Sequence, residues 1–244
     1  YDVEGNVTAE LIAEGTNRTY VKIANIPKHV QEAFIAIEDE RFYEHNGIDI
    51  RGIIRAGVRG LASGFKDMEG ASTITQQLLK NNVFDFMSEE TFLDKVERKI
   101  QEQYLAIQLE KIMDKDEILE SYLNTINLGQ NSLGVQAASN RYFGKSVSEL
   151  TVSEAAVLAA IAKNPSGFNP ISNPEANAER RELVLQNMYD QGYISESEYQ
   201  EALADDVYSR IAEHNEEQST ESTVYSYFVD EVTDQVTRDL VEKA

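Results

Sequence analysis

An uncharged apolar run, AAVLAAIA, occupies residues 155–162 and belongs to a longer helical pattern that ends at Lys163. It is the longest such run in the 244 residues. A helix needs about 20 apolar residues to cross a membrane, so this run has only the length of a helix buried in a globular protein. A chain of this length can enclose such a helix in a sizeable core, either as one large domain with an appendage or as two domains.

Helical periodicity predicts that most of the chain is α-helical. Val30, Phe34 and Ile37 lie on one side of a helix expected from about His29 to Glu44. Residues 165–174, PSGFNPISNP, hold three of the four prolines and predict a break in the chain near residue 171. The other expected helices cover residues 71–113 with a break near 81–89, 115–126, 135–144, 148–163 and 175–205, the last as a charged hairpin.

The first 25 residues show a different pattern. YDVEGNV contains a turn, and TYVKIANI alternates apolar and polar residues at Val21 and Ile23. The predicted fold class is therefore mainly α with short N-terminal β-strands. At the other end, residues 212–223 are polar and indicate a linker.

The net charge of −21 is unevenly distributed. Residues 171–244 hold 18 Asp and Glu against 5 Lys and Arg, which supports a change of character near residue 171. So acidic a chain is a poor candidate for sequence-independent nucleic-acid binding, because Lys and Arg supply that affinity by neutralising phosphates. We therefore expect no nucleic-acid partner, and an anionic ligand has to be met by a local cluster of cations.

A basic segment, RGIIRAGVRGLASGF, spans residues 51–65 and combines apolar residues with Arg51, Arg55 and Arg59. Its four glycines weaken the prediction of a helix. Two interpretations remain open. The segment is either a flexible surface connection or an amphipathic element in a membrane interface, where arginine meets lipid phosphate and the apolar side enters the bilayer.

The stretch AFIAIEDERFYEHNGID places four carboxylates, Glu38, Asp39, Glu40 and Glu44, within an apolar frame. They are either the solvated side of an amphipathic helix, or one of them is held partly out of water because it transfers a proton.

The stretch GASTITQQLLKN, residues 70–81, predicts a turn followed by a helix with a capping box from Thr73 to Gln76. Thr73, Gln77 and Lys80 form one polar stripe on this helix, while Ile74 and Leu78 face the core. An exposed helix start offers free backbone N–H groups to an anion. The stripe therefore favours ligand binding over a purely structural helix.

Further along, Arg98 and Lys99 flank Glu102 at helical spacing. By spacing alone, a surface salt bridge of about 0.3 to 0.5 kcal/mol is the simpler interpretation. The three histidines are too scattered to indicate a metal site, and His45 is expected to be a hydrogen-bonded structural residue.

Five stretches of the chain resemble, in order, the successive motifs of the peptidoglycan glycosyltransferases, glycosyltransferase family 51. These stretches are EDERFYEHNGID, GASTITQQLLKN, RKIQEQYLAIQLEK, KDEILESYLNTINLGQNSLGVQAA and ELTVSEAAVLAAIAKNPSGFNP. The resemblance implies a glycosyltransferase domain over residues 1–170, with a lysozyme-like head and a smaller membrane-associated jaw at about residues 50–66. Residues 171–244 resemble the helical connector of class A penicillin-binding proteins, followed by the start of a truncated transpeptidase region.

The same resemblance implies the reaction and its setting. Lipid II would be polymerised into glycan strands with inversion at C1 of the donor and release of undecaprenyl pyrophosphate. The implied partners are lipid II, the growing glycan strand, the outer face of the bacterial cytoplasmic membrane and other cell-wall synthesis proteins. The full-length protein would be extracytoplasmic and held by a membrane anchor absent from this sequence. No motif for a bound cofactor is present, and a divalent cation, Mg²⁺ or Mn²⁺, would come with the substrate pyrophosphate.

The site residues are also implied by resemblance. Glu38 matches the general base that accepts the proton of the acceptor hydroxyl, and Asp39 its partner in orienting substrate or loop. Glu102 matches the second catalytic glutamate, on the side of the departing pyrophosphate. The matching cations are Lys80, Arg98 and Lys99, and the other substrate-contacting positions are Ser72, Thr73 and Gln77. Glu40 and Glu44 keep the interpretation of solvated charges.

Two other functions remain as alternatives. A lysozyme-like hydrolase would use two carboxylates to cleave glycan strands, but its leaving group is a sugar oxygen that needs a proton, whereas the three cations suit an anion that leaves without one. A non-catalytic lipid II-binding scaffold would not need Glu38.

Overall fold

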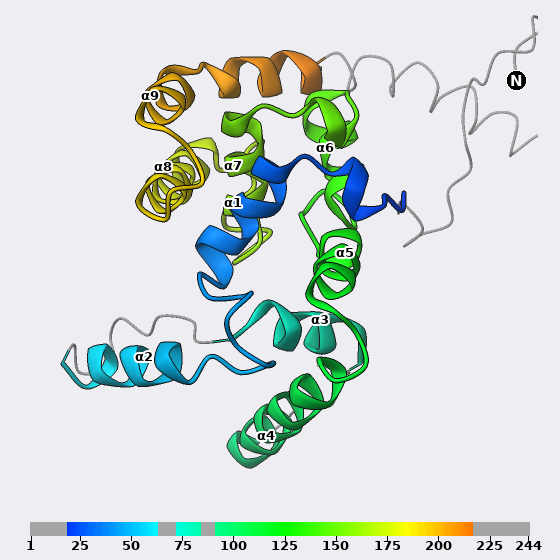
Figure 1. Cartoon of the computed structure of the whole chain (residues 1–244). Helices are drawn as coiled ribbons and strands as arrows, with labels where there is room; N and C mark the ends of the chain where they lie inside the picture. Colours follow the sequence, from blue (N-terminus) through cyan, green and yellow to red (C-terminus); the bar gives the residue numbers. More distant parts are fainter. Residues whose placement is uncertain (1–18, 63–71, 84–90, 217–244) are drawn as a thin grey trace, which may run out of the picture.

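The computed structural model describes residues 19–62, 72–83 and 91–216 of the chain. This part is mainly helical, which confirms the predicted class (Figure 1). The helices are α1 (Lys28–Glu38), α2 (Ile50–Ala62), α3 (Ile74–Val83), α4 (Phe92–Leu109), α5 (Lys115–Thr125), α6 (Val135–Phe143), α7 (Val152–Ile161), α8 (Pro174–Asp190) and α9 (Glu196–Ala204), with 3-10 turns η1 (Ile23–Asn25) and η3 (Val147–Glu149).

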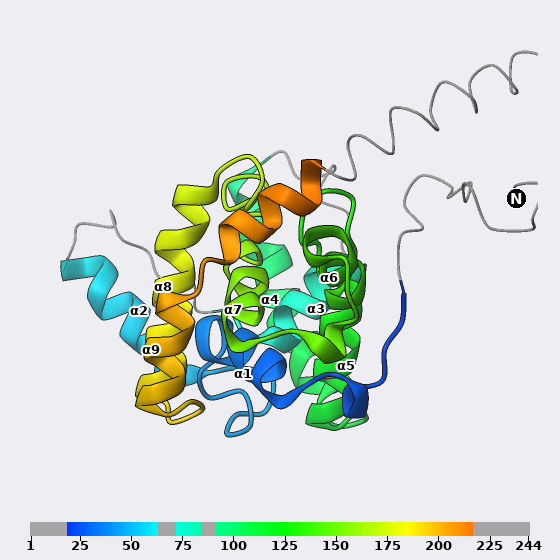
Figure 2. The ribbon, with the colours of Figure 1, turned by 90° about the horizontal axis from the view of Figure 1, so that it is seen from above.

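The apolar helix predicted from the AAVLAAIA run is α7. Every residue from Ser153 to Ile161 is buried, and a capping box between Thr151 and Glu154 begins the helix. Helices α1, α6, α8 and α9 pack against it, and Figure 2 shows α8 and α9 on one side of α7 with α5 and α6 on the other. The prediction of a buried helix is confirmed.

Helix α8 packs against both α1 and α7. Its Val184, Leu185 and Met188 belong to the same hydrophobic core as Phe34 of α1. This part of the chain follows the proline-rich break, yet it contributes to the core that positions the end of α1.

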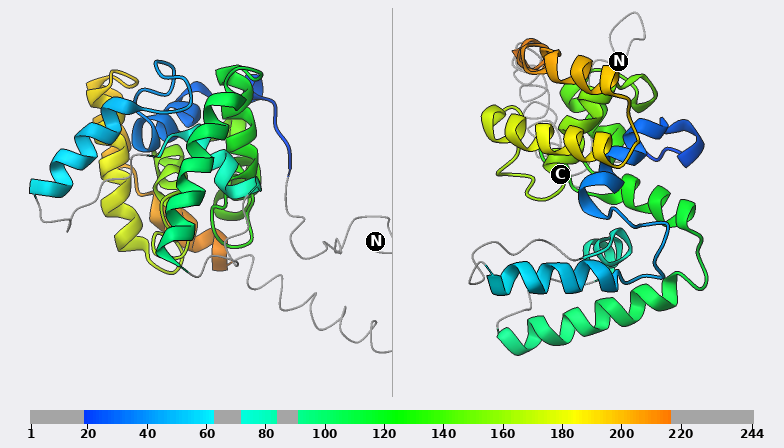
Figure 3. Two further views of the ribbon diagram at one scale, coloured as in Figure 1. Left: turned by 90° about the horizontal axis from the view of Figure 1, so that it is seen from below. Right: turned by 60° about the vertical axis from the view of Figure 1, so that its left-hand side comes forward.

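A second group of helices lies below this core in Figure 1. Helix α3 packs against α4 and α5, and α2 projects sideways from the body (Figure 3, left). The loop of residues 39–49 connects α1 to α2 and therefore joins the two groups. Among the described residues, no helix is both long and apolar enough to cross a membrane.

The N-terminal β-strands predicted for TYVKIANI are wrong. Residues 19–26 contain η1 and no strand, and YDVEGNV lies outside the described residues. The backbone groups of this extended segment form hydrogen bonds with side chains of α5 instead of with a second strand. The Asn124 side chain accepts from the Val21 N–H at 2.7 Å and donates to the Val21 carbonyl at 2.8 Å, and Glu120 accepts from the Ile23 N–H at 2.6 Å. Side chains of one helix thus take the place of a neighbouring strand.

Helix α1 ends six residues earlier than predicted. Asp39 leaves helical geometry with φ −157° and ψ 70°, and residues 40–49 form turns and loop up to α2. The helical pattern of the sequence continues past Glu38. The polar side chains beyond Glu38, however, form hydrogen bonds with α3 and with residues around α4 and α5. These bonds stabilise the loop rather than a longer helix.

The glycine-containing segment after residue 50 forms the helix α2 rather than a flexible connection. Phe65, which belongs to the predicted interface segment, lies outside the described residues. Near the other end of the chain, residues 207–216 are helical, and Val207 and Ile211 pack against Val157 of α7. The linker expected at residues 212–223 is therefore wrong for residues 212–216.

Candidate active site

Glu38 is the last residue of α1, and its carboxylate lies between α3 and α8. Its Oε2 accepts from Gln77 Nε2 at 2.8 Å, and its Oε1 lies 3.4 Å from Arg180 Nη2. The Glu38 side chain is 12% exposed. The carboxylate is thus largely withdrawn from water, held on both oxygens and still open on one side, as a general base requires.

Gln77 connects Glu38 to the core through a second hydrogen bond. Its Oε1 accepts from the Tyr122 hydroxyl at 3.2 Å, which leaves its Nε2 to donate to Glu38. Tyr122 is completely buried, and burial together with the nearby carboxylates of Glu38 and Asp39 raises the pKa of its phenol well above the ordinary value. Tyr122 therefore remains a hydrogen-bond donor and fixes the orientation of the Gln77 amide.

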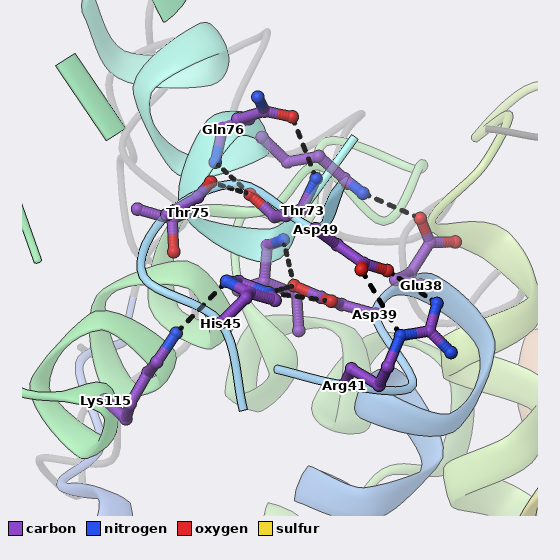
Figure 4. Close-up of polar contacts among 12 residues, drawn as sticks. Glu38, Asp39, Arg41, His45, Asp49, Thr73, Thr75, Gln76 and Lys115 are labelled. Atoms are coloured by element: carbon purple, nitrogen blue, oxygen red, sulfur yellow. Dashed lines mark hydrogen bonds and ion pairs between the residues drawn. The ribbon is translucent and has the colours of Figure 1, made fainter. Parts of the chain in front are cut away.

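Asp39 and Thr73 are both buried and together begin α3 (Figure 4). Asp39 Oδ2 accepts from the Ile74 N–H at 2.9 Å. Thr73 and Gln76 form the predicted capping box, and Thr73 Oγ1 also donates to the Gly47 carbonyl at 2.8 Å. Free N–H groups for an anion were expected here, but those of Thr73, Ile74 and Gln76 are taken. The anion at this helix start is Asp39 itself.

A closed ring of polar contacts holds this arrangement. His45 Nε2 lies 3.0 Å from both oxygens of Asp39, and Lys115 Nζ lies 3.4 Å from His45 Nδ1. Lys115 also donates to Glu110 at 2.8 Å, and Thr75 Oγ1 donates to Glu110 at 2.5 Å. Because Thr75 lies next to Ile74, the ring returns to α3. It confirms that His45 is a hydrogen-bonded structural residue.

Glu102 is buried in α4 and pairs with two cations. Arg98 Nη1 donates to one of its oxygens and Lys99 Nζ to the other at 3.0 Å. The Glu102 side chain is 1% exposed, so the interpretation of a surface salt bridge is wrong. Lys99 also donates to Ser72 Oγ at 2.6 Å, which places these cations beside the start of α3.

The structure brings the sequence-predicted residues together around α3. Asp39, Ser72 and Thr73 lie at its start, Gln77 reaches Glu38 one turn further on, and Lys80 is exposed in its last turn. Arg98, Lys99 and Glu102 approach the same helix from α4, which packs against it. One helix thus has the predicted base on one side and the predicted cations on another.

Arg180 and Tyr122 are site residues that the sequence interpretation did not single out. Arg180 lies in α8, in the segment assigned to a connector, and its Nε donates to the Ala160 carbonyl at 3.1 Å. Burial lowers the pKa of Arg180, while Glu38 acts in the opposite direction. The pair RR at residues 180–181 is the one sequence signal for it, because two adjacent arginines are uncommon in so acidic a region.

We expect Arg180→Met to lower turnover about tenfold. A hydrogen bond to a charged group contributes about 1.5 to 3 kcal/mol, and 3.4 Å is long for such a bond, so the lower end applies. The initial rate of the polymerisation that the sequence resemblance implies would measure the loss. Arg141→Met serves as the control, because Arg141 of α6 is also half-buried but donates to Gln130 and Asn215 rather than to Glu38. A rate for Arg180→Met equal to that of the control would show that Arg180 does not orient Glu38.

In the described part of the chain, the side chains of the candidate site do not fit a divalent metal ion. Both oxygens of Glu102 are taken by Arg98 and Lys99, and these two cations disfavour a further one. In the described ranges, no three His, Asp or Glu side chains are grouped as metal ligands.

Known proteins are similar to this chain in sequence. Penicillin-binding protein 1F of Bacillus subtilis (strain 168) is 52% identical over 197 residues, 81% of this chain and 26% of the relative. Penicillin-binding protein 1A of Clostridium botulinum (strain Langeland / NCTC 10281 / Type F) is 40% identical over 248 residues, 98% of this chain and 29% of the relative. A crystal structure of penicillin-binding protein 1A from Haemophilus influenzae is 30% identical and covers 77% of this chain and 17% of that chain, with a TM-score of 0.45.

The chain therefore spans a little over a quarter of the length of the curated relatives it matches. The family model described as transglycosylase matches residues 4–189. This range includes all the site residues from Glu38 to Arg180, and on this match the chain belongs to the transglycosylase family.

Proposed function

We propose that the chain is a peptidoglycan glycosyltransferase that polymerises lipid II, with Glu38 as its general base. The observation that carries the proposal is the Glu38 carboxylate, held by Gln77 and Arg180 beside a helix whose start Lys99 contacts through Ser72. Arg98 is paired with the same Glu102 carboxylate as Lys99. Transfer of a sugar from a pyrophosphate-linked donor requires a base and a group that stabilises the departing anion. Candidates for both lie at the same helix.

In the proposed step, the 4-hydroxyl oxygen of the acceptor sugar forms a bond to C1 of the donor sugar. Glu38 accepts the hydroxyl proton, and the bond from C1 to the pyrophosphate oxygen breaks on the opposite face, which inverts C1. Undecaprenyl pyrophosphate takes the electron pair and leaves without a proton. The fixed cations Arg98 and Lys99, together with Lys80, stabilise the charge that grows on it. Ser72, Thr73 and Asp39 form the helix start against which the substrate binds, and Gln77 contacts the substrate one turn further on.

The geometry of Glu102 disfavours the alternative hydrolase. A glycan-cleaving enzyme needs a second carboxyl group that protonates the leaving sugar oxygen or attacks C1. Glu102 is fully buried, and both of its oxygens accept hydrogen bonds from cations. It is suited to holding Arg98 and Lys99 in place rather than to donating a proton.

The proposed setting is the outer face of the bacterial cytoplasmic membrane, with the growing glycan strand and other cell-wall synthesis proteins as partners. A divalent ion bound to the substrate pyrophosphate remains part of the proposal. Helix α2 supports the membrane setting, because Ile50, Ile54 and Val58 are each more than 60% exposed on one side of it. Exposed apolar residues beside arginines are typical of helices that lie in a lipid interface.

We expect Ile53→Ser with Ile54→Ser to weaken binding to anionic vesicles about tenfold or more without unfolding the protein. Both side chains are exposed, at 36% and 61%, so the substitutions remove little from the core. The transfer of each apolar side chain contributes about 1.5 to 3 kcal/mol when it is fully buried. Vesicle sedimentation measures the binding, and Leu183→Ser, an exposed residue of α8, is the matched control. Unchanged binding would make α2 an ordinary surface helix.

The direct test of function is incubation of the purified chain with lipid II, scored for glycan polymer. Polymer with release of undecaprenyl pyrophosphate supports the proposal. Shortened strands from preformed glycan, with no polymer from lipid II, would favour the hydrolase.

A further inference from the structure

Arg41 joins the loop that follows Glu38 to the start of α2. Its Nη2 and Nε donate to the two oxygens of Asp49 at 2.6 and 3.3 Å (Figure 4). Both side chains are less than 15% exposed. A two-point contact between a guanidinium and a carboxylate restricts orientation as well as distance, so this pair holds its two segments at a defined angle.

Asp49 in turn is built into the first turn of α2. Its carbonyl accepts from the Ile53 N–H at 3.0 Å. Burial by itself raises the pKa of the Asp49 carboxyl, but the hydrogen bonds from Arg41 and from the Gly52 backbone outweigh it and leave the pKa below its ordinary value. A Cβ atom at residue 52 would lie 2.4 Å from Asp49 Oδ2, so glycine is needed there.

The loop on the other side of the pair is rigidly placed. Gly47 has φ +87°, and a Cβ there would lie 2.6 Å from the Ala106 carbonyl carbon of α4. The same loop is held to the start of α3 by Asp39, which accepts from the Ile74 N–H, and by the Gly47 carbonyl, which accepts from Thr73 Oγ1. Glu38 and Arg41 are three residues apart at the start of this loop.

Among the described residues, helix α2 has few other attachments to the body, and one of them is the exposed pair of Arg51 and Glu44, 3.6 Å apart. Gly52 is buried, whereas Ile50, Ile54 and Val58 are exposed. A second link is present at the surface, where Glu40 accepts from both Arg41 at 2.8 Å and Arg55 at 3.0 Å. Because exposed ion pairs contribute little, the less exposed Arg41 and Asp49 pair is the main connection.

We propose that Arg41 is a positioning residue that sets the angle between α2 and Glu38, so that a helix lying on a lipid surface holds the base at a fixed height above it. This inference rests on the proposed function, in which the substrate pyrophosphate lies at the membrane surface. A substrate in a bilayer cannot move to meet a displaced base, whereas a freely diffusing one can. Loss of the pair should therefore affect membrane-embedded substrate selectively.

The test compares two presentations of substrate for Arg41→Gln. Initial polymerisation rates are measured with lipid II in phospholipid vesicles and with a water-soluble, short-chain lipid II analogue. We expect the ratio of the vesicle rate to the short-chain rate to fall about tenfold. Arg41→Lys keeps the charge but not the two-point contact, and its ratio should fall less. Asp49→Asn removes the same contact from the other side.

Arg210→Gln is the matched control, because Arg210 makes the same two-point contact with Asp205, at 2.6 and 2.8 Å. It should leave the ratio unchanged. An unchanged ratio in both Arg41→Gln and Asp49→Asn overturns the proposal. So does an equal loss in both presentations with a lowered thermal midpoint, which would indicate a structural role alone.

A second measurement does not depend on activity. The sequence contains no cysteine, so Leu183→Cys, exposed on α8, can carry a single fluorescent donor against acceptor lipids in the vesicle. We expect a broader distribution of donor heights in Arg41→Gln than in the parent, and an identical distribution overturns the proposal. If the parent makes no polymer in either presentation, the proposed function fails, and the height measurement still decides the role of Arg41.

Discussion

Glu38→Gln is expected to lower the rate of lipid II polymerisation at least 100-fold. Glutamine keeps the shape of the side chain and a hydrogen-bonding group, but it cannot accept a proton at neutral pH. General-base assistance contributes about 10² to 10⁴ in rate, so the lower figure is the minimum loss if Glu38 is the base. Rates with purified protein and lipid II measure the effect.

A measurement of ligand binding should distinguish a variant that has lost the base from one that has lost the substrate site. Glu38→Gln should bind a lipid-linked pyrophosphate analogue nearly as the parent does, because the cations at the start of α3 are intact. Lys99→Met should weaken both analogue binding and turnover, since it removes one of those cations. Glu44→Gln, in the same motif but 64% exposed at its side chain, is the control and should retain the parent rate.

Polymerisation at near the parent rate by Glu38→Gln would show that the assignment of the base is wrong. Glu102 and Asp39 would then have to be considered. Their side chains are 1% and 2% exposed, against 12% for Glu38, so an acceptor hydroxyl would reach either of them less readily.

Glu102→Gln is expected to lower the stability of the fold by about 3 kcal/mol. Removing one partner of a buried ion pair costs about 3 to 5 kcal/mol, because the remaining charge is left without compensation. The lower end applies since Lys99 is 40% exposed and can turn toward water, while Arg98 is only 18% exposed. For a domain of this size the loss corresponds to a fall of about 6 to 12 °C in the thermal midpoint.

Thermal unfolding followed by circular dichroism measures this loss. Glu97→Gln is the matched control, because Glu97 lies on the same helix, is exposed and accepts only from Gln101 among its hydrogen bonds in the described structure. Its midpoint should stay within about 1 °C of the parent, as is usual for surface substitutions. A similarly small change for Glu102→Gln would mean that Arg98 and Lys99 do not depend on this carboxylate.

Much of the fold could be predicted because it depends on local properties of the chain. Short-range preferences account for the apolar run of α7, the capping box at Thr73 and the turn residues between helices. The structure contains these features where they were predicted. The site residues themselves were named from a resemblance of five stretches. From local sequence alone, Glu38 could equally be a solvated charge on a helix, and Glu102 could equally be part of a surface salt bridge.

The predictions that failed involve contacts between distant segments. Periodicity continues a helix beyond Glu38, but Asp39 makes contacts with Ile74 and His45 that a continued helix would not allow. Alternation at Val21 and Ile23 indicated a strand, but Asn124 and Glu120, about 100 residues away, take up its hydrogen bonds.

The sequence by itself determined most of the helical segments and the position of the main core helix, because helix propensity, capping and apolar periodicity act over a few residues. Only the tertiary structure decided that Glu102 is buried, that Asp39 occupies the helix start expected to bind an anion, and that Arg180 of α8 approaches Glu38. Burial and charge pairing depend on which distant segments pack together, and no local pattern contains that information.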